Sequence, residues 1–158
     1  MFIATARAAD ADMERRIERH RRERDQAWLT VEEPEELAAA LGALVDQADS
    51  VVVDCLTLWV GNRQLRGDSD EAILDEAERL ARLIATRPFD IVVVSNEVGE
   101  GVHPETAAGL RFRDLLGRVN QRLAAACDRV VLMVAGLPLM VKDQRSPPVR
   151  HARFPQAL

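Results

Sequence analysis

Three short runs of β-branched residues constrain the fold of this chain more than any other feature of its sequence. The runs are continuously apolar rather than alternating, which is typical of strands buried on both faces of a parallel sheet. They are Ser50 to Asp54, Asp90 to Val94 and Val130 to Ala135, and Met1 to Ala6 has the composition of a fourth strand. Because helical patterns separate these runs, the sequence predicts a doubly wound α/β domain.

Apolar residues recur at helical spacing in three segments, which are Glu35 to Asp46, Asp70 to Thr86 and Glu105 to Cys127. Pro34 suits the first turn of the first helix, where a backbone N–H has no partner within the helix. The chain from Lys142 onward holds three prolines and no clear period. We therefore predict a single domain over residues 1–142 and an irregular tail over 143–158.

The composition is that of an ordinary globular protein. A length of 158 residues is enough for one well-buried domain, and the net charge of -5 argues against a nucleic-acid-binding surface. Cys55 and Cys127 lie in apolar contexts, which favours buried thiols in a reducing compartment. The chain has neither a membrane-length apolar run nor a signal pattern at Met1. We therefore expect a soluble, cytoplasmic protein.

Polar residues follow the apolar runs at the points where the predicted strands end. Asp54 closes the first run, Ser95, Asn96 and Glu97 follow the second, and Gly136 follows the third. Since ligands of open parallel sheets bind beyond the carboxyl ends of the strands, we expect these residues to face one crevice. A carboxylate in that position is typical of a Mg²⁺ site beside nucleotide phosphates. It is equally typical of a strand end that is solvated or that caps a helix.

A helical pattern from Asp12 to Asp25 places Met13, Ile17 and His20 on one face. Three arginines follow the histidine, namely Arg21, Arg22 and Arg24. Imidazole can attack an activated phosphorus to give a phosphoramidate, and guanidinium groups neutralise phosphate oxygens. The other interpretation is a solvated basic helix with an incidental histidine, and the spacing alone favours it.

Several other polar and aromatic residues are weaker candidates. Neither His103 nor His151 has a partner at metal-ligand spacing. Trp28 and Trp59 are interpreted as packing residues, although Trp59 lies near a strand end and has the position to line a pocket. Asn120 interrupts an amphipathic helix, where it is either exposed or caps a site.

Five stretches of the chain, taken in order, carry a resemblance to a known family. They are FIATARAADADMERRIERHRRERDQAW, TVEEP, VVVDCLTLWVGN, VVVSNEVGEGVHPE and FRDLLGRVNQRLAAACDRVVLMVAGLPLMVK, and they cover nearly all of residues 2–142. In this order they resemble the bifunctional adenosylcobinamide kinase/adenosylcobinamide-phosphate guanylyltransferase family of cobalamin biosynthesis. The ordered set is far more specific than any one motif, and it favours the catalytic interpretation of the histidine.

The resemblance implies a fold and two reactions. The fold is a P-loop NTPase-like (RecA-like), mostly parallel sheet with helices on both faces. The family phosphorylates adenosylcobinamide with ATP or GTP and then transfers GMP from GTP onto that phosphate, releasing pyrophosphate and forming adenosylcobinamide-GDP. A histidine at the position of His20 carries GMP covalently. The partners implied are the corrinoid substrate and further copies of the chain, as a homo-oligomer that is a trimer.

The resemblance also implies which residues contact the guanine nucleotide. They are Ala4, Thr5 and Ala6, then Arg21, Arg22, Glu23 and Arg24, then Glu32 and Asp54. Their chemistry suits these roles, because a carboxylate such as Glu32 accepts hydrogen bonds from the N1 and N2 donors of guanine. Asp54 would serve Mg²⁺, and the arginines would hold phosphates.

One motif of the family does not occur in this sequence. Family members begin with a strand and a GxxxxGKS loop, whereas the chain has no GxxxxGK[ST] and its only lysine is Lys142. We therefore expect little kinase activity from the chain as written, because such a loop cradles the nucleotide phosphates. The alternatives are a working protein with an earlier start, a non-catalytic relative that binds nucleotide or corrinoid or completes an oligomer, and an unrelated small phosphotransfer protein.

Overall fold

A computed structural model describes residues 1–144 of the chain, which fall into two compact units. The first unit is Met1–Ala126 and the second begins at Cys127. The boundary between the units lies inside the predicted domain of residues 1–142. His151 and most of the predicted tail lie outside the described residues.

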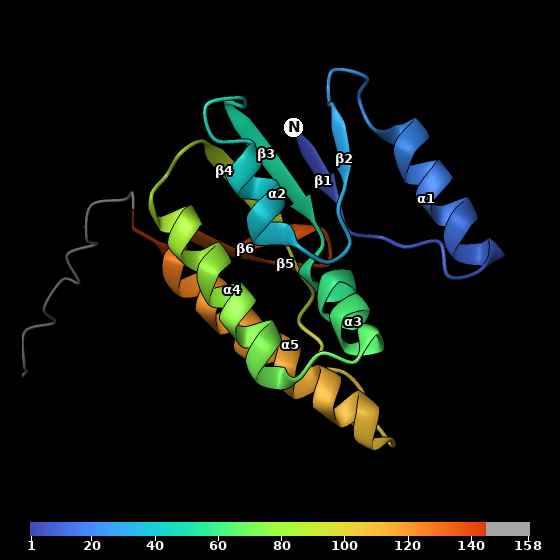
Figure 1. The fold of residues 1–158 in the computed structure, drawn as a ribbon. Coiled ribbons are helices and arrows are strands. Elements are labelled where there is room, and N and C mark those ends of the chain that lie inside the picture. Colours follow the sequence, from blue (N-terminus) through green and yellow to red (C-terminus); the bar gives the residue numbers. More distant parts are fainter. Residues whose placement is uncertain (145–158) are drawn as a thin grey trace, which may run out of the picture. The chain divides into compact units, whose positions relative to one another are not determined.

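The first unit is built on a parallel sheet of four strands (Figure 1). The strands lie in the order β2-β1-β3-β4 and comprise β1 (Phe2–Ala4), β2 (Thr30–Glu32), β3 (Ser50–Asp54) and β4 (Asp90–Val94). The predicted bounds of β3 and β4 are confirmed, whereas β1 is shorter than predicted. Strand β2 was not predicted, because three residues are too few to give a recognisable period.

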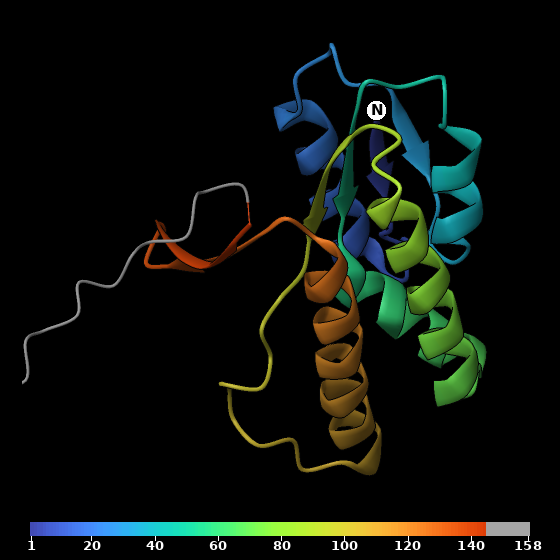
Figure 2. The same ribbon diagram turned by 90° about the vertical axis from the view of Figure 1, so that its left-hand side faces the viewer.

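Five helices accompany this sheet, and the α/β class is confirmed. They are α1 (Ala11–Glu23), α2 (Leu37–Ala43), α3 (Leu56–Arg66), α4 (Asp70–Ala85) and α5 (Ala107–Ala126). Helices α4 and α5 lie side by side in both views (Figures 1 and 2). Helix α3, which follows β3 almost directly, was not predicted.

The prediction that Pro34 occupies the first turn of a helix is wrong. Helix α2 begins at Leu37, with Glu36 as its N-cap residue. The Glu33 carboxylate accepts hydrogen bonds from the backbone N–H groups of Glu35 and Glu36, at 2.9 and 2.8 Å. This local turn occupies the backbone donors that an earlier first turn would present, so the helix starts later.

The core of the first unit lies between the sheet and its helices. Fully buried side chains come from β1, β3 and all the helices except α1, and include Ile3, Val53, Trp59, Leu80 and Leu116. Burial on both faces was expected for all the strands, and it fails for β4. There Val92 is 59% exposed and Val94 38% exposed, and these alternate residues share one face of the sheet, which is therefore open to solvent at β4.

The second unit is an antiparallel hairpin of β5 (Arg129–Val134) and β6 (Leu137–Asp143). The prediction that Val130 to Ala135 joins the parallel sheet is therefore wrong. Ala135 and Gly136 form the two-residue turn with φ of 50° and 79°, a pair of positive values that suits the twist of a tight hairpin. Gly136 is thus a turn residue and not the end of a parallel strand. Asp143, which was predicted to begin the irregular tail, is the last residue of β6.

Candidate active site

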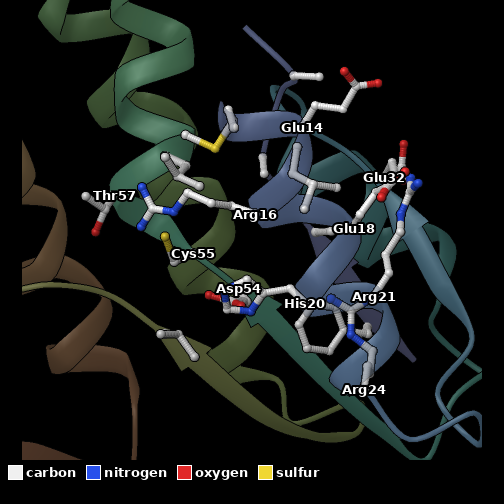
Figure 3. A pocket seen from close by; sticks show the side chains of 18 of the residues that line it. Glu14, Arg16, Glu18, His20, Arg21, Arg24, Glu32, Asp54, Cys55 and Thr57 are labelled. Atoms are coloured by element: carbon white, nitrogen blue, oxygen red, sulfur yellow. The ribbon is translucent and has the colours of Figure 1, made fainter. Parts of the chain in front are cut away.

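A cavity of about 510 Å³ lies between α1 and the carboxyl edge of the parallel sheet (Figure 3). A volume of this size is typical of small-molecule sites. The cavity is lined by Phe2, Ala4, Ala6, Ala8, Met13, Glu14, Arg16, Ile17, Glu18, His20, Arg21, Arg24, Glu32, Asp54, Cys55, Thr57, Leu58, Val94 and Asn96. All of these residues belong to the first unit, so the site is contained within one compact body.

One side of the cavity, which we call the sheet wall, consists of the last residues of the four strands. Glu32, Ala4, Asp54 and Val94 are aligned partners in the parallel register and form one row across the sheet. Parallel pairing brings the carboxyl ends together, as expected for a ligand site of an open sheet. The prediction that the polar residues at the strand ends face a common crevice is confirmed for Asp54 and Asn96, which line this cavity, but not for Ser95 and Glu97, which do not.

The opposite side, which we call the helix wall, is α1. Its N-cap residue Asp10 accepts hydrogen bonds from the N–H groups of Asp12 and Met13, at 3.0 and 2.8 Å. Met13, Ile17 and His20 all line the cavity, which confirms their predicted common face. No residue of α1 is buried, so this helix presents its apolar stripe to the cavity and not to a packed core.

The His20 side chain extends from α1 into the cavity toward Asp54 at the end of β3 (Figure 3). The residue is exposed, so a solute in the cavity has access to its imidazole. In the described residues no protein group forms a hydrogen bond or an ion pair with the ring. Access, together with a lone pair on one ring nitrogen, is what a nucleophilic imidazole requires.

Three arginines line the cavity, and two of them, Arg21 and Arg24, make polar contacts with the protein. Arg21 forms an ion pair with Glu32 across the gap between α1 and β2. Arg24 donates a 2.7 Å hydrogen bond to the Thr30 hydroxyl and lies 3.4 Å from the centre of the Phe2 ring. Burial lowers the pKa of Arg24, and the nearby charge of Asp54 opposes that shift.

Three of the predicted nucleotide contacts do not line the cavity. Thr5 is fully buried, and its hydroxyl donates to the Cys55 carbonyl and accepts from the Cys55 N–H, both at 2.8 Å. Alternate residues of an extended segment point to opposite faces, so Ala4 and Ala6 reach the cavity while Thr5 cannot. Arg22 pairs with Glu18 at 2.8 Å on the helix surface, and Glu23 ends the helix exposed to solvent.

The loops behind the sheet wall are fixed by side chains of α3 and α5. Asn62, which is buried, donates to the carbonyls of Thr5 at 2.8 Å and Pro34 at 3.1 Å. The indole N–H of fully buried Trp59 donates to the Glu35 carbonyl at 2.7 Å. The packing interpretation of Trp59 is therefore confirmed. Asn120 donates to the Asn96 carbonyl at 3.1 Å, so it supports the segment after β4 instead of lying free in solvent.

An ion-pair cluster reinforces these loops from the far end of α3. Arg63, almost fully buried, pairs with Asp68 and donates to the Glu35 carbonyl at 3.1 Å. Arg66 pairs with Glu35 at 2.7 Å, Glu36 at 2.8 Å and Asp68 at 2.6 Å. Hydrogen bonds from the two arginines hold the pKa of Asp68 below its ordinary value, and the same network raises the pKa of Arg66.

Sequence reasoning missed several residues of the cavity, including Arg16 and Thr57. Arg16 lies four residues before His20, and this spacing places the two on the same helix face. Thr57 donates to the Asn96 side chain at 2.7 Å and accepts from the Asn96 N–H at 3.1 Å. The i,i+4 spacing to His20 was the signal that could have identified Arg16. No comparable signal existed for Thr57, because the helix that carries it was not predicted.

The described residues contain no group of three or more His, Cys, Asp or Glu side chains that could hold a metal ion. At the strand ends the cavity presents two carboxylates, of which Glu32 is paired with Arg21 and Asp54 makes no ion pair among the described residues. A single carboxylate suits Mg²⁺, which is commonly held by one or two carboxylates together with water and substrate phosphates.

Among the residues that the structure describes, no helix has the length and hydropathy required to cross a membrane.

Comparisons with known proteins agree with the resemblance seen in the sequence. A family model described as cobinamide kinase / cobinamide phosphate guanyltransferase matches residues 1–141. The chain is 41% identical over 143 residues to the bifunctional adenosylcobalamin biosynthesis protein CobP of Pseudomonas aeruginosa, covering 90% of this chain and 82% of that relative. It is 36% identical over 154 residues to each of the proteins named CobU from Escherichia coli and Salmonella typhimurium, covering 90% of this chain and 85% of each relative.

Proposed function

Because the chain belongs to the cobinamide kinase / cobinamide phosphate guanyltransferase family, we propose that its cavity transfers GMP from GTP through a covalent bond to His20. One observation carries the proposal: the imidazole of His20 lines the same cavity as three arginines and the strand-end carboxylates of Glu32 and Asp54. The acceptor is adenosylcobinamide phosphate and the product is adenosylcobinamide-GDP.

Glu32 is proposed to read the guanine base. It ends β2 at the edge of the sheet wall, and its carboxylate is paired with Arg21. A carboxylate accepts hydrogen bonds from the N1 and N2 donors of guanine, whereas adenine has no donor at either position. The arginine holds the carboxylate in place and leaves part of its acceptor capacity for the base. This pairing would make the site prefer GTP over ATP for the guanylyl step.

The phosphates are proposed to lie between the arginines and Asp54. Arg24 is the better placed of the two cations, because Thr30 and the Phe2 ring fix its orientation while its charge is not paired with a carboxylate in the described residues. A fixed guanidinium binds phosphate oxygens in a defined geometry. Asp54 would hold Mg²⁺ together with the phosphates, and the ion would neutralise phosphate charge when bound.

The covalent step conserves atoms and charge in a simple way. The lone pair of one His20 ring nitrogen attacks the α-phosphorus of GTP, a P–N bond forms, and the bond to the bridging oxygen breaks to release pyrophosphate. A phosphate oxygen of the acceptor then attacks the same phosphorus. The P–N bond breaks, and its electron pair returns to the imidazole nitrogen.

Family membership supports three further parts of the proposal. The family's first reaction phosphorylates the aminopropanol hydroxyl of adenosylcobinamide with ATP or GTP, and the chain as written, which has no GxxxxGK[ST] loop, would carry it out with little activity. It would act in the cytoplasm, where its nucleotide substrates are found. It would also assemble as a homo-oligomer, a trimer by the same resemblance, and light scattering of the purified chain would measure this state.

Radioactive labelling tests the guanylyl step directly. Incubation with GTP labelled at the α-phosphorus is expected to leave label on the protein that is stable to alkali and lost in acid, as for a phosphoramidate. His20→Ala should abolish this label. His103→Ala is the matched control, because His103 lies outside the cavity and contacts Arg113 at 2.9 Å. Label that persists in His20→Ala, or that never forms on the unaltered chain, would contradict the proposal.

A further inference from the structure

Of the three arginines that line the cavity, Arg16 is the one that makes no polar contact with the protein among the described residues. It lines the cavity from α1, and within residues 1–144 it makes no ion pair or hydrogen bond. The other arginines of this region have partners, since Arg21 pairs with Glu32, Arg22 pairs with Glu18 and Arg24 bonds to Thr30. A cation that faces a cavity without a protein anion is free to bind an anionic ligand.

Arg16 is also placed beside the nucleophile. It precedes His20 by four residues in α1, so the two side chains share a helix face with roughly 6 Å between their Cβ atoms. Figure 3 shows its side chain directed toward Thr57, on the opposite side of His20 from the Arg21–Glu32 pair. The histidine therefore stands between Arg21, which is already paired with Glu32, and Arg16, which is unpaired among the described residues.

We propose that Arg16 is a further catalytic residue, which contacts the phosphoryl group while it moves to and from His20. This inference rests on the proposed guanylyl transfer. In the transition state the negative charge of that group is spread over its non-bridging oxygens, and a guanidinium one helical turn from His20 is within reach to stabilise it. Arg21 is less suited to this role, because Glu32 already neutralises its charge.

The same phosphorus is attacked in both half-reactions, once by the imidazole of His20 and once by the acceptor phosphate. A residue that contacts the transferred group must therefore accelerate both steps. A residue that only binds the guanine end of GTP would change the KM for GTP and leave the rate at saturation unchanged. This difference separates Arg16 from the nucleotide-binding residues.

The test uses Arg16→Ala in the full chain, with Arg19→Ala as a matched control. The Arg19→Ala substitution removes the same charge from the same helix. Arg19 is exposed and does not line the cavity. Arg16→Ala should slow, by about a hundredfold, both the labelling of His20 by GTP and the release of label to the acceptor. The KM for GTP should change little, Arg16→Lys should recover part of the rate, and Arg19→Ala should behave as the unaltered chain.

Each outcome decides a different point. If the unaltered chain and Arg16→Ala become labelled at equal rates, Arg16 has no catalytic role although the proposed function stands. The same conclusion follows if Arg16→Ala raises only the KM for GTP, or if Arg19→Ala is slowed as much as Arg16→Ala. If the unaltered chain does not become labelled, the proposed function fails and this inference fails with it. A circular dichroism spectrum that matches the unaltered chain excludes loss of α1 as the cause of a slow variant.

Discussion

The two walls of the cavity are held in different ways. The sheet wall consists of four strands paired in parallel. The loops that follow these strands accept hydrogen bonds from the buried side chains of Thr5, Trp59 and Asn62. The helix wall has an N-cap at Asp10 but no buried residue. The groups proposed to hold the base and the metal lie on the sheet wall, whereas the nucleophile lies on α1. The part proposed to bind the base and the metal is thus preorganised, whereas the nucleophile and the arginines proposed to bind the phosphates are on, or at the end of, the helix that has no buried residue.

This difference predicts where substitutions lower stability and where they lower activity. Changes behind the sheet wall should lower the free energy of unfolding of the whole unit, because they leave buried groups unsatisfied. Changes on α1 should alter activity with little effect on global unfolding, because local opening of a poorly packed helix does not require the core to open.

The largest stability effect is expected for Asn62→Ala. The side chain satisfies the carbonyls of Thr5 and Pro34 from a buried position, and its removal leaves both without a partner. The free energy of unfolding should fall by about 2–4 kcal/mol, measured by urea denaturation. His20→Ala, in the helix wall, is the comparison and should change it by less than about 0.5 kcal/mol. Equal effects of the two substitutions would remove the distinction between the walls.

The sequence predicted the sheet wall better than its supports. Long β-branched runs gave β3 and β4 with their bounds, and the acid at the end of β3 indicated Asp54 as a site residue. Strand β2 was too short to detect, although its last residue, Glu32, was found through the family resemblance. Thr5 was assigned to the site as part of a motif, but strand alternation turns its side chain into the core. A motif names a segment, and only the local geometry decides which of its side chains reach the ligand.

The hairpin of the second unit shows a different limit of sequence reasoning. The run from Val130 to Ala135 has the composition of a buried parallel strand, and composition does not distinguish that role from one arm of a hairpin. The distinguishing feature is the second apolar run from Leu137 to Val141, which pairs with the first across Ala135 and Gly136. The partner of a strand is a property of two segments, so neither run alone reveals the pairing.

An intermediate effect is expected from pH, through Asp68 and the cluster behind the sheet wall. Hydrogen bonds from Arg66 and Arg63 lower the pKa of this carboxyl in the folded chain. Its stabilising contribution is therefore complete above the unfolded pKa of about 4 and is lost as the pH falls through the lower folded value.

Urea midpoints measured from about pH 6 down to about pH 2.5 should fall more steeply for the unaltered chain than for Asp68→Asn, which has no proton to take up. The effect should be smaller than that of Asn62→Ala, because Arg66 is partly exposed and retains two other carboxylate partners. If the urea midpoints of the two proteins fell in parallel with pH, protonation of Asp68 would make no contribution to the loss of stability in acid. Asp114→Asn is a suitable control, since Asp114 is exposed and pairs only with neighbouring Arg113 among the described residues.

The smallest effect on global stability, but a clear one on activity, is expected for Asp10→Ala. Asp10 caps α1 through two backbone hydrogen bonds, and loss of an N-cap costs a helix about 1 kcal/mol. Because α1 has no buried residue, that cost should appear as faster amide exchange in α1 while the urea midpoint stays constant. Labelling of His20 by GTP should slow several-fold, since the histidine spends less time facing Asp54. Asp10→Asn, which retains a capping oxygen, should restore both exchange and labelling. If Asp10→Ala instead lowered the urea midpoint as much as Asn62→Ala, α1 would be part of the cooperative core, and the helix wall would be as firmly held as the sheet wall.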